Sequence, residues 1–208
     1  MSLIRLKSRE EIVERDPWWD GFGIPLPDGT IRRKTLDEYY AGIERMRLNP
    51  AVPENVQQPF ETARNIYLYS YFAHRFLMVA ELQVRISVEF ALREKALANE
   101  VEVQEWWGLK HLVDQAIKQG WIVDVGFEIF RHNEAARQRD REMWPEMFAD
   151  LPEHLRQDQQ RYCKIIAESF PKIRNTLAHG SNMLYSSVLG SFEIAADLIN
   201  QLFAGPIA

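Results

Sequence analysis

The strongest constraint on the fold is a long stretch of the chain that contains no helix-breaking residue. Residues 60–99 include neither glycine nor proline, and apolar side chains recur through them at intervals of mostly three or four. This periodicity predicts a long buried helix, or two helices separated by a subtle break. The residues expected to face inward are Phe72, Phe76, Val79, Leu82, Ile86, Phe90 and Leu97.

Capping signals mark further helices on both sides of this stretch. Thr35 and Glu38 form a capping-box pair, and Pro50 ends the helix that this pair opens. Gly120 and Gly180 stand where helix C-terminal caps are expected. The predicted helices cover residues 35–48, 108–120, 127–143, 153–179 (with a bend at Pro171) and 188–203.

Residues 17–34 differ in character from the helical segments. They carry three glycines and three prolines, and Pro27-Asp28-Gly29 is a turn signal between short apolar runs. We therefore expect a small β-hairpin or an irregular arm in this region. Taken together, the patterns predict an all-α protein: an N-terminal arm with short helices (residues 1–58) followed by a helical bundle (residues 59–208).

Composition excludes several classes of protein. The chain has 208 residues, 46% of them hydrophobic, which is enough to form a core without metals or disulfides. Cys163 is the single cysteine, so no disulfide can form within the chain, and a cytoplasmic location is expected. No run of about 18 apolar residues is present, so we expect no membrane span. The net charge of −5 argues against a broadly basic nucleic-acid binder but allows a local basic patch.

The segment with the clearest chemical character is 170–180. It places Lys172, Arg174, Asn175 and His179 at the end of a predicted helix, where the helix dipole favours cations. Asn175 and His179 are four residues apart and share a face, so the amide can orient the imidazole. Arg174 and His179 lie about 140° apart around the axis, so one helix aims them only partly together. Two such helices, paired symmetrically, would gather two arginines and two histidines in one cleft.

The order Arg174-Asn-Thr-Leu-Ala-His179 resembles the signature of the HEPN superfamily, an arginine, then four to six residues, then a histidine. Residues 81–93 also look like the earlier long helix of such domains. The resemblance covers residues 59–203 and implies a HEPN-like helical bundle. As a function it implies a metal-independent endoribonuclease of toxin or defence type, usually a homodimer with a composite site. In that chemistry the RNA 2′-hydroxyl attacks the adjacent phosphate.

Carried over residue by residue, the resemblance implies a role for each side chain of the motif. His179 would be the general acid and base, and Arg174 would stabilise the charge of the phosphorane. Asn175 would orient the histidine or contact the phosphate. Lys172 and Ser181 would support the site, and Ser181 stands where one antitoxin-paired subgroup of the family carries a tyrosine.

Glu89 and Arg93 form an i,i+4 pair that could lie near this site. The expected partners are RNA, a second copy of the chain, and an antitoxin or another protein. No cofactor and no metal is implied, since the remaining histidines lack the spacing of metal ligands. Two alternatives stay open. One is a catalytically silent HEPN-like module that binds a nucleotide, RNA or a protein partner, and the other is a helical dimerisation domain in which the cations only cap a helix.

Overall fold

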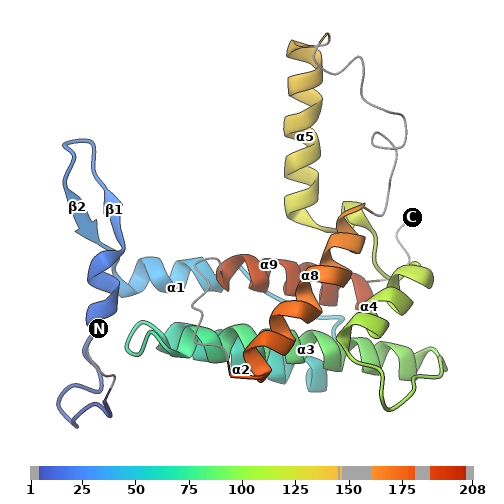
Figure 1. Cartoon of the computed structure of the whole chain (residues 1–208), viewed down its shortest axis with the longest axis horizontal. Coiled ribbons are helices and arrows are strands. Elements are labelled where there is room, and N and C mark those ends of the chain that lie inside the picture. The colour runs from blue at the N-terminus through green and yellow to red at the C-terminus, as the bar shows by residue number, and fades with distance from the viewer. Residues whose placement is uncertain (1–4, 145, 147–160, 181–187, 205–208) are drawn as a thin grey trace.

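The computed structural model describes residues 5–144, 146, 161–180 and 188–204. Within these ranges the chain forms seven α-helices, two short 3₁₀ helices and one two-stranded hairpin, which confirms the predicted all-α fold with an N-terminal arm (Figure 1). In chain order the elements are η1 (Pro17–Gly21), β1 (Gly23–Pro25), β2 (Ile31–Arg33), α1 (Leu36–Glu44), α2 (Glu54–Tyr69), α3 (Phe76–Ala98), α4 (Leu109–Lys118), η2 (Asp124–Gly126), α5 (Glu128–Met143), α8 (Arg161–Ala178) and α9 (Val188–Phe203).

Helix α3 is the centre of the bundle. Helices α2, α8 and α9 pack around it, and α4 packs against both α3 and α8. The face of α3 that these helices cover carries small or branched side chains, which let neighbouring backbones approach closely. Ala80, Val84, Val88 and Ala91 are each 0% exposed on this face.

The inward face predicted for this helix was wrong. Phe76, Val79, Ile86 and Leu97 are exposed by 45%, 49%, 38% and 74%. The other predicted residues, Phe72, Leu82 and Phe90, are only partly buried. The long helix carries two apolar series that are offset around its axis, and the series with the smaller side chains is the one that packs. Phe76, Val79 and Ile86 consequently form an apolar surface stripe, called here the α3 stripe.

A buried polar network joins α3 to α8 and α9. The Arg85 guanidinium donates to Glu81 Oε1 at 2.5 Å and to Ser191 Oγ at 3.0 Å. It also donates to the Phe170 carbonyl at 3.0 Å and lies 3.8 Å from the centroid of the Phe170 ring. Glu81 and Arg85 are each 1% exposed. Because α8 contributes a backbone carbonyl to this network, Arg85 fixes the position of α8 on α3.

The N-terminal arm contains the hairpin. Strand β1 pairs antiparallel with β2, with Ile24 opposite Arg32, and Gly29 takes a left-handed φ of 81° in the connecting turn. The predicted capping box is confirmed, since the Thr35 hydroxyl accepts from Glu38 N at 3.2 Å and the Glu38 carboxylate accepts from Thr35 N at 2.9 Å. The hairpin stands at one end of the molecule, beyond the start of α1 (Figure 1).

Residues around η1 attach the arm to the bundle. Trp19 Nε1 donates to the Ser70 carbonyl at 3.0 Å. The Asp16 carboxylate accepts from the backbone N of His74 at 2.9 Å and lies 2.9 Å from its Nδ1. Helix α2 begins at Glu54, so the expected division between residues 58 and 59 falls inside this helix.

Both α5 and α8 contact the short helix η2. Helix α5 rises away from the bundle (Figure 1). The Asp124 carboxylate accepts from the backbone N of Tyr162 and of Cys163, both at 2.8 Å, and so holds the first described turn of α8. Helix α8 continues through Pro171, whereas its predicted beginning at residues 153–160 lies outside the described residues. None of the described helices is both long and apolar enough to cross a membrane.

Candidate functional site

The C-terminal end of α8 presents the predicted motif. The helix ends at Ala178, and Gly180 turns the chain with a φ of 86°, in the left-handed region. His179 N donates to the Asn175 carbonyl at 3.0 Å, and Gly180 N donates to the Leu177 carbonyl at 3.1 Å. Leu177 is buried, whereas His179 is exposed. The bundle therefore anchors one side of this helix end and leaves the histidine in solvent.

Arg174 is the residue of the motif that meets α3. Its Nη2 lies 3.3 Å from Oε2 of Glu89, and Nη2 of Arg93 lies 3.4 Å from Oε1 of the same carboxylate. One carboxylate thus faces two guanidinium groups, and the three side chains, called here the α3–α8 cluster, carry a net positive charge. The Glu89 side chain is 17% exposed, against 33% and 34% for Arg174 and Arg93. An anion in solvent therefore reaches the cations more readily than the carboxylate.

The two arginines of the cluster are held differently. Arg93 Nη2 also donates to the carbonyl of Trp107, two residues before α4, and this bond fixes the Arg93 guanidinium. Besides its ion pair with Glu89, Arg174 makes one long contact to a described residue, 3.4 Å from Nη1 to the side-chain oxygen of Asn175. Its buried Nε and the facing Oε2 of Glu89 form no hydrogen bond with described residues. The guanidinium of Arg174 consequently keeps donor capacity for an oxyanion, whose geometry its planar fork matches.

The predicted contact between Asn175 and the imidazole of His179 is not made in the described structure. The side-chain oxygen of Asn175 faces Arg174 instead. The imidazole of His179 forms no hydrogen bond with a described residue. His179 is therefore free to turn toward a ligand or a second chain, but Asn175 does not orient it.

Of the two remaining predicted residues, the structure describes only Lys172, and it places Lys172 in a different part of the surface. Lys172 lines an open groove along α8, together with Arg161, Lys164 and Glu168, and neither Arg174 nor His179 lines that groove. Ser181 lies outside the described residues. Within the described part of the chain, the structure thus brings Glu89, Arg93 and Arg174 together and leaves Lys172 apart.

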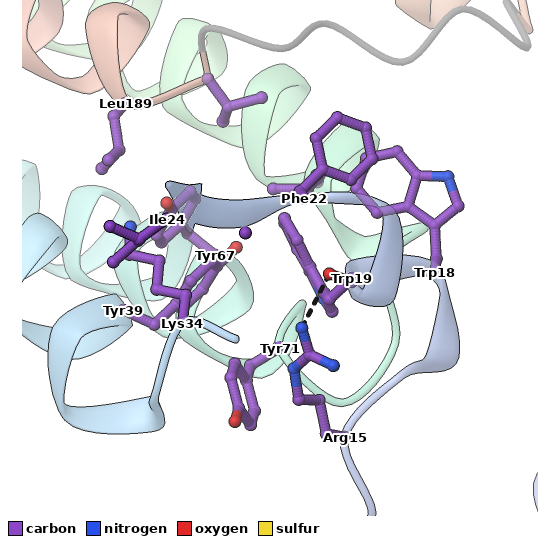
Figure 2. Close-up of a pocket in the computed structure, with 13 residues that line it drawn as sticks. Arg15, Trp18, Trp19, Phe22, Ile24, Lys34, Tyr39, Tyr67, Tyr71 and Leu189 are labelled. Carbon is purple, nitrogen blue, oxygen red and sulfur yellow. Dashed lines mark hydrogen bonds between the residues drawn. The ribbon is translucent and has the colours of Figure 1, made fainter. Parts of the chain in front are cut away.

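Sequence reasoning missed a cavity of about 400 Å³ between the N-terminal arm and the bundle (Figure 2). Its walls are mainly aromatic, and Trp18, Trp19, Tyr67 and Tyr71 contribute to them. The adjacent tryptophans and the i,i+4 tyrosines were visible in the sequence. Nothing in their spacing shows that two segments about fifty residues apart enclose one space.

Neither a metal-ligand group among the described residues nor a similar known protein assigns a function to either site. No three or more His, Cys, Asp or Glu side chains among the described residues are grouped so as to hold a metal ion. Comparisons with protein-family models, with curated proteins and with solved structures find no match for this chain.

Proposed function

We propose that the chain is a metal-independent endoribonuclease that acts as a homodimer, with Arg174 and His179 of both copies in a shared cleft. The observation that carries this proposal is the ion pair of 3.3 Å that holds Arg174 against Glu89, on the helix that ends just before the solvent-exposed His179. A guanidinium that is fixed on one side and open on the other suits contact with a phosphate. An imidazole within reach of solvent suits proton transfer to and from RNA.

The proposed reaction is an internal transfer of the phosphodiester. The RNA 2′-oxygen attacks the adjacent phosphorus, and the bond from phosphorus to the 5′-oxygen breaks. One His179 imidazole takes the proton of the 2′-hydroxyl, and that of the second copy gives a proton to the leaving 5′-oxygen. Arg174 offsets the charge that builds on the non-bridging oxygens. The products are a 2′,3′-cyclic phosphate and a 5′-hydroxyl, so the step balances without water or metal.

A second copy of the chain supplies what one helix lacks. Arg174 lies on α8 and His179 directly follows the last residue of that helix. Five residues at helical spacing put them about 140° apart around the axis, so they do not converge within one copy. The α3 stripe adjoins the α3–α8 cluster, because Ile86 and Glu89 are three residues apart on the same helix. Exposed apolar side chains beside a charged site favour an interface there. A dimer through this face would cover the α3 stripe and bring two motifs together.

A catalytically silent RNA-binding or nucleotide-binding module is the second candidate. The observation that favours it is the free imidazole of His179, which no described residue orients. In that case the arginines of the α3–α8 cluster would hold a phosphate, and no bond would break.

An RNA cleavage assay in the presence of a chelator tests the proposal. Wild-type protein and the variants Arg174→Ala and His179→Ala are incubated with transfer, messenger and ribosomal RNA. Cleavage by the wild type that both substitutions reduce by about a hundredfold or more is the expected result. Intact RNA with all three proteins would overturn the proposed nuclease function. Binding of labelled RNA that Arg174→Ala abolishes would then support the silent module.

A further inference from the structure

The cavity between the N-terminal arm and the bundle is built from segments far apart in the chain. Trp18, Trp19 and Phe22 come from η1 and its end, and Tyr39, Tyr67 and Tyr71 come from α1, α2 and the turn after α2. Figure 2 shows these rings around a common space, with Leu189 of α9 above it. A volume of about 400 Å³ is at the lower end of the range for small-molecule sites.

Hydrogen bonds and ring stacking fix the aromatic walls in place. The rings of Tyr39 and Tyr67 stack with centroids 4.8 Å apart and an interplanar angle of 4°. The Ser70 hydroxyl donates to the Tyr67 carbonyl at 2.6 Å, so the Tyr39 hydroxyl is the donor in its 2.6 Å bond to that same serine. Trp19 Nε1 donates to the Ser70 carbonyl. The walls are thus already ordered without a ligand, which lowers the entropic cost of binding one.

The charged side chains that line the cavity are both cations. Lys34 and Arg15 lie along it, and no carboxylate is among its described lining residues. Arg15 is paired, since Nη1 lies 2.5 Å from Asp20 and Nη2 donates to the Trp19 carbonyl at 2.8 Å. Lys34 has no carboxylate partner in the described part of the chain, and its Nζ lies 5.5 Å from the centroid of the Tyr39 ring. The cavity therefore has an uncompensated positive charge at Lys34.

This arrangement selects against a cationic ligand. An aromatic cage often binds a cation through the faces of its rings. Here Lys34 already lies over Tyr39, and the Arg15 guanidinium lies 5.9 Å from the centroid of the Tyr71 ring. Both side chains would repel a second cation, whereas an anionic group would neutralise the charge of Lys34.

We propose that this cavity binds a small planar aromatic molecule that carries one anionic group. Its ring system would lie among the tryptophan and tyrosine side chains, and its carboxylate, sulfonate or phosphate would lie at Lys34. Aromatic rings stack favourably on such walls, and the ammonium group supplies the charge complement. This site is separate from the α8 motif and does not depend on RNA cleavage.

A matched pair of fluorescent probes tests the site. The probes are 8-anilinonaphthalene-1-sulfonate, which is anionic, and N-phenyl-1-naphthylamine, which has the same rings without the sulfonate. Each is titrated into wild-type protein and into the variants Lys34→Met and Lys95→Met. Lys95 is the control because its ammonium also lies over an aromatic ring, 5.8 Å from the centroid of Trp121, but outside the cavity. Circular dichroism verifies that each variant is folded.

The expected result is that Lys34→Met weakens binding of the anionic probe by about tenfold and changes binding of the neutral probe by less than about twofold. Lys95→Met should change neither. A further variant, Phe22→Ala, should weaken both probes, because Phe22 lines the cavity yet is 51% exposed and contributes little to the core. An exposed aromatic outside the cavity, Phe76, provides the matched control Phe76→Ala.

Three results would overturn the proposal. If neither probe binds, the cavity is not a ligand site. An equal loss of affinity for both probes in Lys34→Met means that the ammonium group does not select an anion. Affinities unchanged in both Lys34→Met and Phe22→Ala mean that the probes bind elsewhere on the surface.

Discussion

Arg174 on α8 and Glu89 on α3 lie 3.3 Å apart, from Nη2 to Oε2, and this pair joins the motif to the central helix of the bundle. Arg93 faces the other oxygen of the same carboxylate at 3.4 Å. The two arginines of this cluster therefore share the Glu89 carboxylate, and its removal should affect the orientation of Arg174 more than the fold.

Replacing Glu89 by glutamine keeps the shape of the side chain and removes its charge. Under the proposed function, Glu89→Gln should lower the RNA cleavage rate by about ten- to a hundredfold, because Arg174 loses the group that positions it. The control is Glu94→Gln on the same helix, where the carboxylate instead accepts from Asn55 on α2. Initial rates of cleavage of a labelled RNA measure the effect. Equal rates for the two variants would contradict a positioning role for Glu89.

Arg85 should be the most sensitive charged residue for stability. Arg85→Met leaves the carboxylate of Glu81 buried without its ion pair, which should cost about 3–5 kcal/mol of unfolding free energy. Arg47→Met also removes an ion pair, with Glu44, but there the Arg47 side chain is 66% exposed, and its loss should cost less than about 1 kcal/mol. Urea denaturation measures both. A loss in Arg85→Met no larger than that in Arg47→Met would show that the buried network is not important for stability.

Replacing either of two glycines by alanine should change the stability of the protein, in opposite directions at the two positions. Gly180 has a φ of 86°, so Gly180→Ala should destabilise the protein by about 1 kcal/mol through backbone strain. Gly190 lies within α9 with open space around its added methyl group, so Gly190→Ala should stabilise by about 0.5–1 kcal/mol. No described atom lies within 4 Å of the added methyl group at Gly180 either, so steric contact with the described residues does not explain a difference. Thermal unfolding followed by circular dichroism decides the signs.

The attachment of the arm should weaken in acid. Burial acts to raise the pKa of Asp16, but the backbone N–H groups of His74 and Trp18 and the His74 side chain more than offset it, so this pKa lies below its ordinary value. A lowered pKa in the folded state stabilises the protein above the unfolded value of about 3.9, and this contribution disappears as the pH falls through the folded value.

Asp16→Asn removes that contribution. The melting temperature of the wild type should therefore fall more steeply than that of Asp16→Asn as the pH is lowered from about 5 to about 2. Asp20→Asn is a control at the same arm, since its carboxylate is 46% exposed. Parallel curves for wild type and Asp16→Asn would mean that Asp16 does not carry the acid sensitivity.

Local signals in the sequence predicted the local structure well. The Thr35 capping box and the Asp28-Gly29 hairpin turn depend on residues within a few positions of each other, and both form as predicted. The inward face of α3 could not be predicted in this way. Both of its apolar series have helical spacing, and the choice between them depends on which one α2 and α9 can approach closely.

The candidate sites likewise combine features that are visible in the local sequence with features that depend on long-range packing. The i,i+4 pair of Glu89 and Arg93 is visible within one helix, and so is the motif of α8. That Arg174 faces this pair depends on how α8 crosses α3, which Arg85 and the Phe170 carbonyl determine. The aromatic cavity likewise requires η1 to pack beside the end of α2. This contact joins distant segments, so the spacing of residues within either segment does not predict it.

The chemical ends of cleaved RNA test the central claim most directly. RNA is incubated in chelator with wild type, His179→Ala and the control His132→Ala, whose side chain is 75% exposed on α5, away from the motif. We predict 2′,3′-cyclic phosphate and 5′-hydroxyl ends with wild type and His132→Ala, and intact RNA with His179→Ala. The same ends from His179→Ala, or intact RNA from all three proteins, would contradict the account.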